Sequence, residues 1–254
     1  MNLIDTHCHL PSLEHSPLPE ILERAEKAHV TKMVCIGAGS AKDAAFEAVA
    51  LAEKYPQVWA SVGIHPHDAG STTDIEGLKS LFAKPKVVAL GETGLDFFRD
   101  WAPKDKQVEL FESSIILALE LNLPLIIHCR AAEEDTLATL KKLGAEKVGG
   151  VFHCYGGDAP LAAVLREMNF LVSITGTVTF KGAHALRETV KEIPLTQLML
   201  ETDAPYMAPE PFRGGPSEPA HVLQVAQMIA KVKGITVEEV AETTTATALK
   251  FFRI

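Results

Sequence analysis

Histidines and carboxylates recur along this chain in short motifs whose chemistry suits divalent metal ions. The sequence contains ten histidines. Six of them stand at or just after the ends of short apolar runs: His7, His9, His65, His67, His128 and His153. Glu92 and Asp203 end two further runs. Imidazole nitrogens and carboxylate oxygens are common ligands of zinc, manganese and related ions, so the pattern predicts a metal site that activates water.

The His-x-His pair at the end of the first run is a weak signal by itself. Alternation along a strand puts His7 and His9 on one face. A structural pair hydrogen-bonded to backbone is an equal interpretation of such a motif. His128, His153 and Asp203 occupy equivalent positions on other runs, which favours a ligand set over coincidence.

Short apolar runs alternate with segments of helical spacing, and this order predicts the fold. The helical pattern is clearest over residues 104–122 and 237–252. Eight strand–helix units in about 250 residues predict a single (β/α)8 TIM barrel of the metal-dependent hydrolase type, one domain over residues 1–254. A doubly wound sheet is the rival, but neither GxGxxG after the first run nor a P-loop is present. The predicted strands are Asn2–His7, Lys32–Gly37, Val58–Gly63, Val87–Glu92, Leu125–His128, Gly150–His153, Phe170–Ile174 and Leu198–Asp203.

The carboxyl ends of parallel barrel strands meet at one mouth, where active sites are built. The reactive residues above occupy those ends, so the fold would gather them. Cys8, Cys129 and Cys154 each follow a candidate histidine and are expected to turn away as small buried packing residues.

Composition limits the partners that we expect. The formal charge is −9, from 24 Lys and Arg against 33 Asp and Glu. A broad basic face for duplex nucleic acid is therefore disfavoured. Neither a signal peptide nor a membrane-spanning run is predicted, so we expect a cytoplasmic protein with reduced thiols, no membrane association and no obligate protein partner.

In combination, the motifs resemble those of the TatD-type metal-dependent hydrolases, within the amidohydrolase-like barrel superfamily. They run in order from the first strand to the last and cover nearly the whole chain. The matching stretches are Asp5–Leu10, Gly63–His67, Gly91–Phe97, Leu123–Arg130, His153–Tyr155, Ser173–Gly176 and Glu201–Tyr206.

The resemblance implies a barrel with two divalent ions, magnesium, manganese, zinc or a similar metal. Carried onto this sequence, it assigns His7, His9, Glu92 and Asp203 to one ion, and Glu92, His128 and His153 to the other. It also implies a deoxyribonuclease, notably a 3′ to 5′ exonuclease on single strands. Some family members are described as D-aminoacyl-tRNA deacylases, which keeps ester hydrolysis as the alternative.

One stretch departs from the family pattern. Where the family usually has Asn-Glu-Pro after an Arg-Gly stretch, this chain reads Ser217-Glu218-Pro219. Ser is a good helix N-cap and Pro fits a first helical turn, so the structural role is expected to survive. Any contact that needed an Asn amide is in doubt.

Other residues receive supporting roles. Asp5 and Glu201 lie two positions before His7 and Asp203 on the same faces, so we expect them to support the ligands from deeper in the barrel. His65 is favoured as a phosphate contact over a metal ligand. Arg130 could bind phosphate as a forked donor, or form a salt bridge. Asp96 is interpreted as a turn-former or an arginine partner.

The leading hypothesis is two-metal hydrolysis of a phosphodiester at an exposed, single-stranded DNA end. Glu92 would bridge the ions, and Asp203 would accept or steer the proton of the attacking water. Hydrolysis of an ester or amide uses the same water activation and remains open. A non-catalytic barrel that binds a partner is disfavoured because all six ligands are present.

Overall fold

The structure is a computed structural model that describes residues 1–38, 43–70 and 75–254. Strands and helices alternate along the chain, as predicted. The chain divides into two compact units. Unit 1 consists of Met1–Cys35, Cys154–Glu167 and Leu171–Ile254, and unit 2 of Ile36–His153 and Met168–Phe170.

Unit 1 holds the first and last strands of the series. Strand β1 pairs in parallel with β2, and β7 pairs in parallel with β8. The Thr6 hydroxyl of β1 donates to the Leu200 carbonyl of β8 over 3.0 Å. Strands β2 and β7 each cross a unit boundary at one end. The bounds are β1 Leu3–Cys8, α1 Leu18–Lys27, β2 Val30–Gly37, α5 Ala159–Glu167, β7 Phe170–Ile174, α6 His184–Glu192, β8 Leu198–Leu200, α7 Val222–Lys233 and α8 Val237–Phe252.

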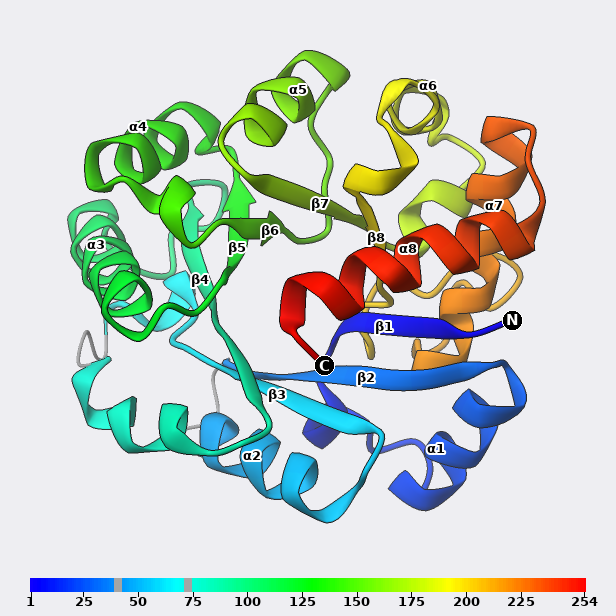
Figure 1. The fold of residues 1–254 in the computed structure, drawn as a ribbon, viewed down its shortest axis with the longest axis horizontal. Coiled ribbons are helices and arrows are strands. Elements are labelled where there is room, and N and C mark those ends of the chain that lie inside the picture. The colour runs from blue at the N-terminus through cyan, green and yellow to red at the C-terminus, as the bar shows by residue number, and fades with distance from the viewer. Residues whose placement is uncertain (39–42, 71–74) are drawn as a thin grey trace. The chain divides into compact units, whose positions relative to one another are not determined.

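Helix α8 closes the chain and lies alongside β1 (Figure 1). Its N-terminus is a capping box, in which the Thr236 hydroxyl accepts from the Glu239 amide and the Glu239 carboxylate accepts from the Thr236 amide. This arrangement satisfies amides that an uncapped helix end leaves unpaired. The Thr245 hydroxyl then donates to the Asn2 carbonyl over 2.8 Å, so the closing helix is tied to the start of the first strand.

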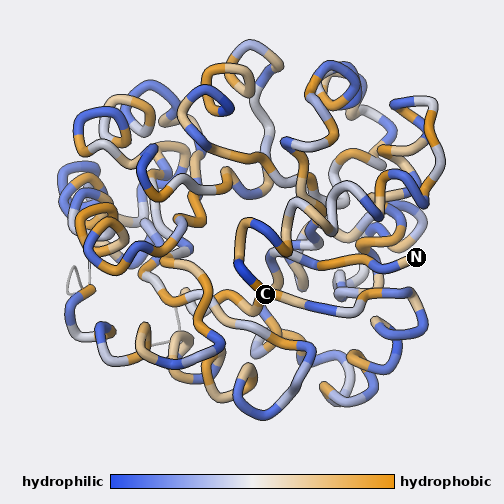
Figure 2. The backbone as a smooth tube through the Cα atoms, in the orientation of Figure 1, coloured by the Kyte–Doolittle hydropathy of each residue, from blue (hydrophilic) through white to orange (hydrophobic). Residues whose placement is uncertain are grey.

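Unit 2 is a run of parallel strands covered by helices. Strands β3 to β6 pair in chain order. Helices α3 and α4 lie side by side against β4 and β5 (Figure 1). Apolar and polar residues alternate along these helices (Figure 2), as expected when one face packs on a sheet. The bounds are α2 Ala44–Lys54, β3 Val58–Val62, β4 Val87–Asp96, α3 Lys104–Leu121, β5 Leu125–Arg130, α4 Glu133–Leu143 and β6 Gly150–Phe152.

Strand β4 is longer than predicted and is buried along its whole length. It continues past Glu92 to Asp96, which pairs with Arg130 of β5. Glycine makes this close pairing possible. Gly94 has φ +137°, and a Cβ there would overlap the carbonyl oxygen of His128. The extension places Asp96 in the same strand as Glu92, two pleat repeats farther along.

Strand β8 is shorter than predicted. It ends at Leu200, whereas the predicted strand continued through Glu201 and Thr202 to Asp203. The Thr202 amide and hydroxyl turn toward the Asp5 carboxylate, and Asp203 has a left-handed φ of +54°. The expectation that Glu201 and Asp203 share one strand face is therefore wrong, because neither residue belongs to the strand. Within the described residues, no helix is long and apolar enough to cross a membrane.

The segment that departs from the family pattern caps a short 3-10 helix, η7 (Pro219–His221). Its N-cap is Glu218, so the prediction that Ser217 is the cap is wrong. Ser217 is buried, and its amide donates to the Pro205 carbonyl over 2.9 Å. Glu218 accepts from Arg24 of α1 through Nε at 2.9 Å and Nη2 at 2.7 Å.

The Arg24–Glu218 pair makes stability depend on pH. Burial raises the pKa of Glu218, but the hydrogen bonds from Arg24 and His15 outweigh this effect, so the net pKa lies below its usual 4.5. A lowered carboxyl pKa stabilises the fold above the unfolded value, and this stabilisation is lost as pH falls through the folded value. We expect Glu218→Gln to lower the free energy of unfolding at pH 7 by about 1–3 kcal/mol.

Urea unfolding of metal-free protein at pH 7 and at pH 3 checks this expectation. The difference in free energy of unfolding between the parent and Glu218→Gln should be smaller at pH 3 than at pH 7. The exposed Glu188 of α6 offers a matched control, since Glu188→Gln removes a charge without a buried pair. If this difference does not change with pH, the destabilisation comes from altered packing and not from the charge of Glu218.

Candidate metal centre

In unit 2, one carboxylate and two imidazoles meet in a tight triangle. Glu92 Oε1 lies 2.7 Å from His153 Nε2 and 2.9 Å from His128 Nδ1. The two imidazole nitrogens are 3.3 Å apart. Glu92 comes from the middle of β4, His128 from β5, and His153 directly follows β6. Neighbouring parallel strands thus bring three predicted ligands together, with Glu92 before the carboxyl end of its strand.

The charges of this triangle are strongly coupled. Burial raises the pKa of Glu92, but the charges of His153 and His65 and hydrogen bonds from His128 and His153 outweigh it, so the net pKa lies well below the usual value. Burial lowers the pKa of His128, yet hydrogen bonds to Asp96 and Glu92 raise it overall. Glu92 is therefore an ionised, buried carboxylate at neutral pH, which is the state a metal ligand needs.

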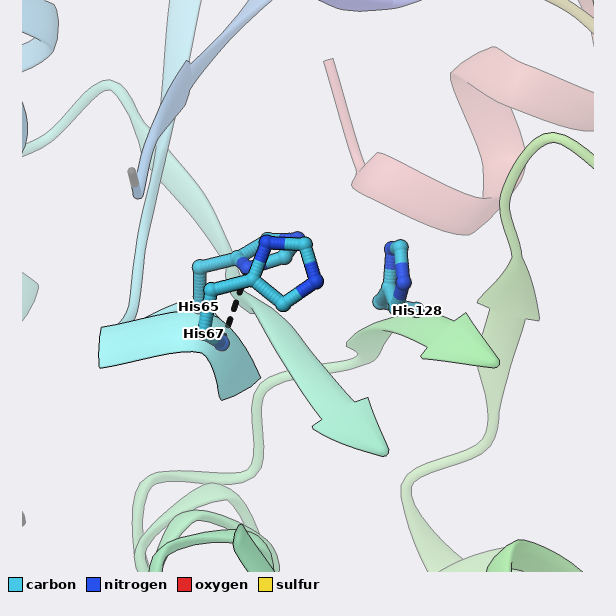
Figure 3. Close-up of side chains that lie close together, drawn as sticks. All are labelled: His65, His67 and His128. Atoms are coloured by element: carbon cyan, nitrogen blue, oxygen red, sulfur yellow. Dashed lines mark hydrogen bonds between the residues drawn. The ribbon is translucent and has the colours of Figure 1, made fainter. Parts of the chain in front are cut away.

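A second histidine pair lies beside the triangle. His65 and His67 flank the start of a 3-10 helix, η2 (Pro66–Asp68), and their rings face that of His128 from β5 (Figure 3). His65 Nε2 is 3.4 Å from Glu92 Oε1, so His65 lies next to the predicted ligands. The nitrogens of these three histidines are close enough to share an ion. However, His65 Nδ1 accepts from the His67 amide, and His67 Nε2 contacts Asp96.

Asp96 has a larger role than the sequence indicates. Its Oδ1 accepts from the amides of Phe98 and Arg99, which confirms the predicted turn. Its Oδ2 lies 2.7 Å from His67 Nε2 and 3.0 Å from His128 Nε2. A neutral His128 that donates Nε2–H to Asp96 presents a lone pair on Nδ1 to the triangle. Sequence spacing gives residue positions but not ring tautomers, so this contact could be found only in the structure.

In unit 1, three more predicted ligands meet around one carboxylate oxygen. Asp203 Oδ1 is 3.4 Å from His9 Nε2 and 3.6 Å from His7 Nε2. The Asp203 amide donates to the His7 carbonyl over 2.9 Å, and the His9 amide donates to the Ala204 carbonyl over 2.8 Å. These backbone bonds fix the segment after β8 against the end of β1. His7 and His9 therefore lie close to Asp203, as predicted.

The two predicted supporting acids of unit 1 hold backbone. Asp5 accepts from the Thr202 hydroxyl over 2.6 Å and from the amides of Thr202 and His7. Burial raises the pKa of Asp5 to about 8, although these hydrogen bonds lower it. Glu201 accepts from the Cys154 amide over 2.6 Å and from the Ser173 hydroxyl. Both acids therefore position segments that carry, or directly follow, predicted ligands.

The remaining predicted residues lie as follows. Arg130, at the end of β5, is exposed, and its guanidinium lies 4.0 Å from the centre of the Phe98 ring. Cys8 is buried as predicted, whereas Cys129 and Cys154 are only half-buried. Their thiols contact Thr136 and Thr175, respectively. The prediction of a buried packing residue is confirmed for Cys8 and is wrong for Cys129 and Cys154, which are partly exposed. Arg130 faces solvent.

The unit 2 triangle fits a divalent ion. An ion with ligand bonds of about 2.1 Å keeps neighbouring ligand atoms about 3.0 Å apart in octahedral geometry and about 3.4 Å apart in tetrahedral geometry. Glu92, His128 and His153 show separations of 2.7, 2.9 and 3.3 Å. Mixed nitrogen and oxygen donors suit zinc, manganese, iron or cobalt, and the carboxylate also accepts magnesium.

Comparison with known proteins decides the family. The family model described as TatD related DNase matches residues 4–253. The chain belongs to the TatD family. A Bacillus subtilis relative, the uncharacterized metal-dependent hydrolase YabD, is 45% identical over 255 residues and 99% of each chain. The TatD-family relative from Rahnella, named 3′-5′ ssDNA/RNA exonuclease TatD, is 35% identical over 92% of each chain. The predicted metal-dependent hydrolase class is confirmed.

The fold comparison agrees with this assignment. The crystal structure of the TatD homologue YJJV from Escherichia coli matches with a TM-score of 0.92 at 30% identity, over 99% of this chain and 98% of that one. In the part of the chain that the structure describes, eight strands follow one another in sheet order. The predicted fold class, a (β/α)8 TIM barrel, is therefore confirmed.

The contact between Asp96 and His128 generates a testable expectation for this TatD-family site. Asp96→Asn keeps an oxygen to accept from Phe98 and Arg99, but its amide N–H faces His128 Nε2 and favours the wrong tautomer. Loss of such a carboxylate partner typically weakens metal binding about 10- to 100-fold. Titration of metal-free protein with Mn²⁺ or Zn²⁺ against a competing chelator measures the effect.

A control variant distinguishes the effect of the His128 tautomer on metal affinity from the effect of losing one negative charge. Asp100 is exposed in the loop that follows β4, so Asp100→Asn removes the same charge at a distance from His128 and should leave metal affinity unchanged. Equal affinities for parent and Asp96→Asn would show that Asp96 only shapes the turn.

Proposed function

We propose that this TatD-family hydrolase cleaves phosphodiester bonds at the 3′ end of single-stranded DNA and uses two divalent ions. The observation that carries the proposal is the Glu92–His128–His153 triangle, whose donors and spacing suit water activation by a metal. The family description and the name of the Rahnella relative support a nucleic-acid substrate.

The proposal shares Glu92 between the two ions. His128 and His153 complete the ligands of one ion, and His7, His9 and Asp203 complete those of the other. The local geometry of each cluster supports its own members, and the sharing of Glu92 between the ions rests on the family motifs. Bound divalent ions would neutralise the scissile phosphate and lower the pKa of a water molecule.

The protein's own side chains have distinct tasks in this reaction. Asp203 accepts the proton of the attacking water, because its carboxylate lies beside His7 and His9 and can act as a general base there. His65, next to Glu92, and the exposed guanidinium of Arg130 bind substrate phosphate. The net charge of −9 limits the number of phosphate contacts and favours a strand end over a duplex.

The direct test compares single strands labelled at the 3′ or the 5′ end, with Mg²⁺ or Mn²⁺ and with a chelator. Stepwise release of nucleotides from the 3′ end, abolished by the chelator, is expected. An aminoacyl ester assayed in parallel tests the alternative hydrolase. Turnover of the ester without any turnover of DNA would overturn the proposal.

Glu92 has the largest expected effect on metal content. Reconstituted parent protein should contain two ions per chain. Glu92→Ala should lower occupancy of both positions, since a bridging carboxylate contributes to each. Elemental analysis after removal of free metal measures the content, with the exposed Glu134 of α4 as control in Glu134→Ala. A full complement of tightly held metal in Glu92→Ala would remove Glu92 from the bridging role.

Asp203 has the largest expected effect on rate. Asn tolerates the left-handed backbone at this position and keeps one ligating oxygen, so Asp203→Asn should fold and bind metal. Its amide cannot accept the proton, and general-base loss costs about 10²- to 10⁴-fold in turnover. Turnover is measured at saturating metal, with occupancy determined on the same sample. A fully metallated variant within threefold of the parent would place the base elsewhere.

A further inference from the structure

Two large aromatic side chains stand exposed in the loop that joins β4 to α3. Phe98 is 59% exposed and Trp101 is 64% exposed. Exposed aromatic residues of this size are costly in water, and grouped ones mark binding surfaces. We call Phe98, Arg99, Trp101 and Arg130 the loop patch.

Two guanidinium groups accompany the aromatic rings of the loop patch. Arg130 lies 4.0 Å from the centre of the Phe98 ring, and Arg99 lies 5.4 and 5.3 Å from those of Phe98 and Trp101. These are cation–π distances. The patch therefore combines flat apolar surfaces with positive charge, in a chain whose net charge is −9.

The loop patch is anchored next to the histidine cluster. The Trp101 ring meets that of His67 edge to face at 4.4 Å, and the His67 ring is 4.2 Å from that of His65. The Phe98 and Arg99 amides donate to Asp96, whose other oxygen contacts His128. All these residues belong to unit 2. The rings of His67 and His65 therefore connect Trp101 to the neighbourhood of Glu92.

We propose that the loop patch binds unpaired nucleobases of a single strand by stacking, while Arg99 and Arg130 contact the flanking phosphates. This inference rests on the proposed function, because it places the bases of that substrate. Aromatic faces and guanidinium planes are the two surfaces on which single-stranded bases stack. In a duplex the base faces are already covered by their neighbours, so the patch selects strands with free bases.

Intrinsic fluorescence gives a direct test without catalysis. The chain has two tryptophans, Trp59 and Trp101. Trp59→Phe leaves Trp101 as the sole tryptophan, and a chelator prevents turnover. The probes are an oligothymidylate and an abasic deoxyribose-phosphate oligomer of equal length and charge. Stacking predicts that oligothymidylate quenches Trp101 emission and that the abasic oligomer binds about 10-fold more weakly without quenching.

Variants of the patch complete the test. Phe98→Ala in the Trp59→Phe background should weaken oligothymidylate binding about 10-fold and leave abasic binding unchanged. Phe46→Ala, at an exposed phenylalanine of α2, is the matched control and should bind like the parent. With metal present, Trp101→Ala should raise KM for the oligonucleotide and change kcat by less than threefold. All three side chains are exposed, so the fold should tolerate their loss.

The outcomes separate this inference from the proposed function. Base-dependent quenching in a protein that hydrolyses no DNA would uphold the stacking site and defeat the exonuclease. Hydrolysis of DNA with unchanged emission, and with equal KM for parent and Trp101→Ala, would overturn the stacking site. Equal binding of the two oligomers would also overturn it, and would leave the exposed rings as a contact surface for another protein.

Discussion

The geometry of unit 2 depends on keeping one buried carboxylate charged. Glu92 is 2% exposed, and an isolated ionised acid at such a position would take up a proton instead. His153 and His128 prevent this by direct contact, and His65 adds its charge from 3.4 Å. The same three histidines are then confined near Glu92. The need to keep Glu92 ionised thus explains why histidine side chains from separate segments converge on its Oε1 atom.

A buried carboxylate in each unit holds segments that carry predicted ligands. In unit 2, Asp96 connects the turn after β4 to the rings of His67 and His128. In unit 1, Asp5 connects the His7 amide to Thr202 after β8. Both acids are fully buried and accept several hydrogen bonds. Such supports restrict the motion of the predicted ligands, which would lower the entropy cost of binding a metal ion.

Much of this arrangement was predictable because it follows from chain order and periodicity. Strand β7 and helix α8 have the predicted bounds, and the parallel topology explains why ligands at strand ends lie close together. The end of β8 was not predictable, because the left-handed φ of Asp203 and the hydrogen bonds from Thr202 to Asp5 join segments that are far apart in the sequence. The tautomer role of Asp96 depends on ring orientation. Phe98 and Trp101 lie in an irregular loop, where periodicity carries no information.

The backbone of Asp203 also limits which side chains evolution can place there. Its φ of +54° suits short Asp or Asn, whereas longer side chains adopt that region at a steric cost. Glutamate would retain the negative charge but would resist the turn that brings the residue to His7 and His9. Aspartate at this position thus suits both the proposed chemistry and the backbone conformation, and an exchange between the two acids would not be conservative.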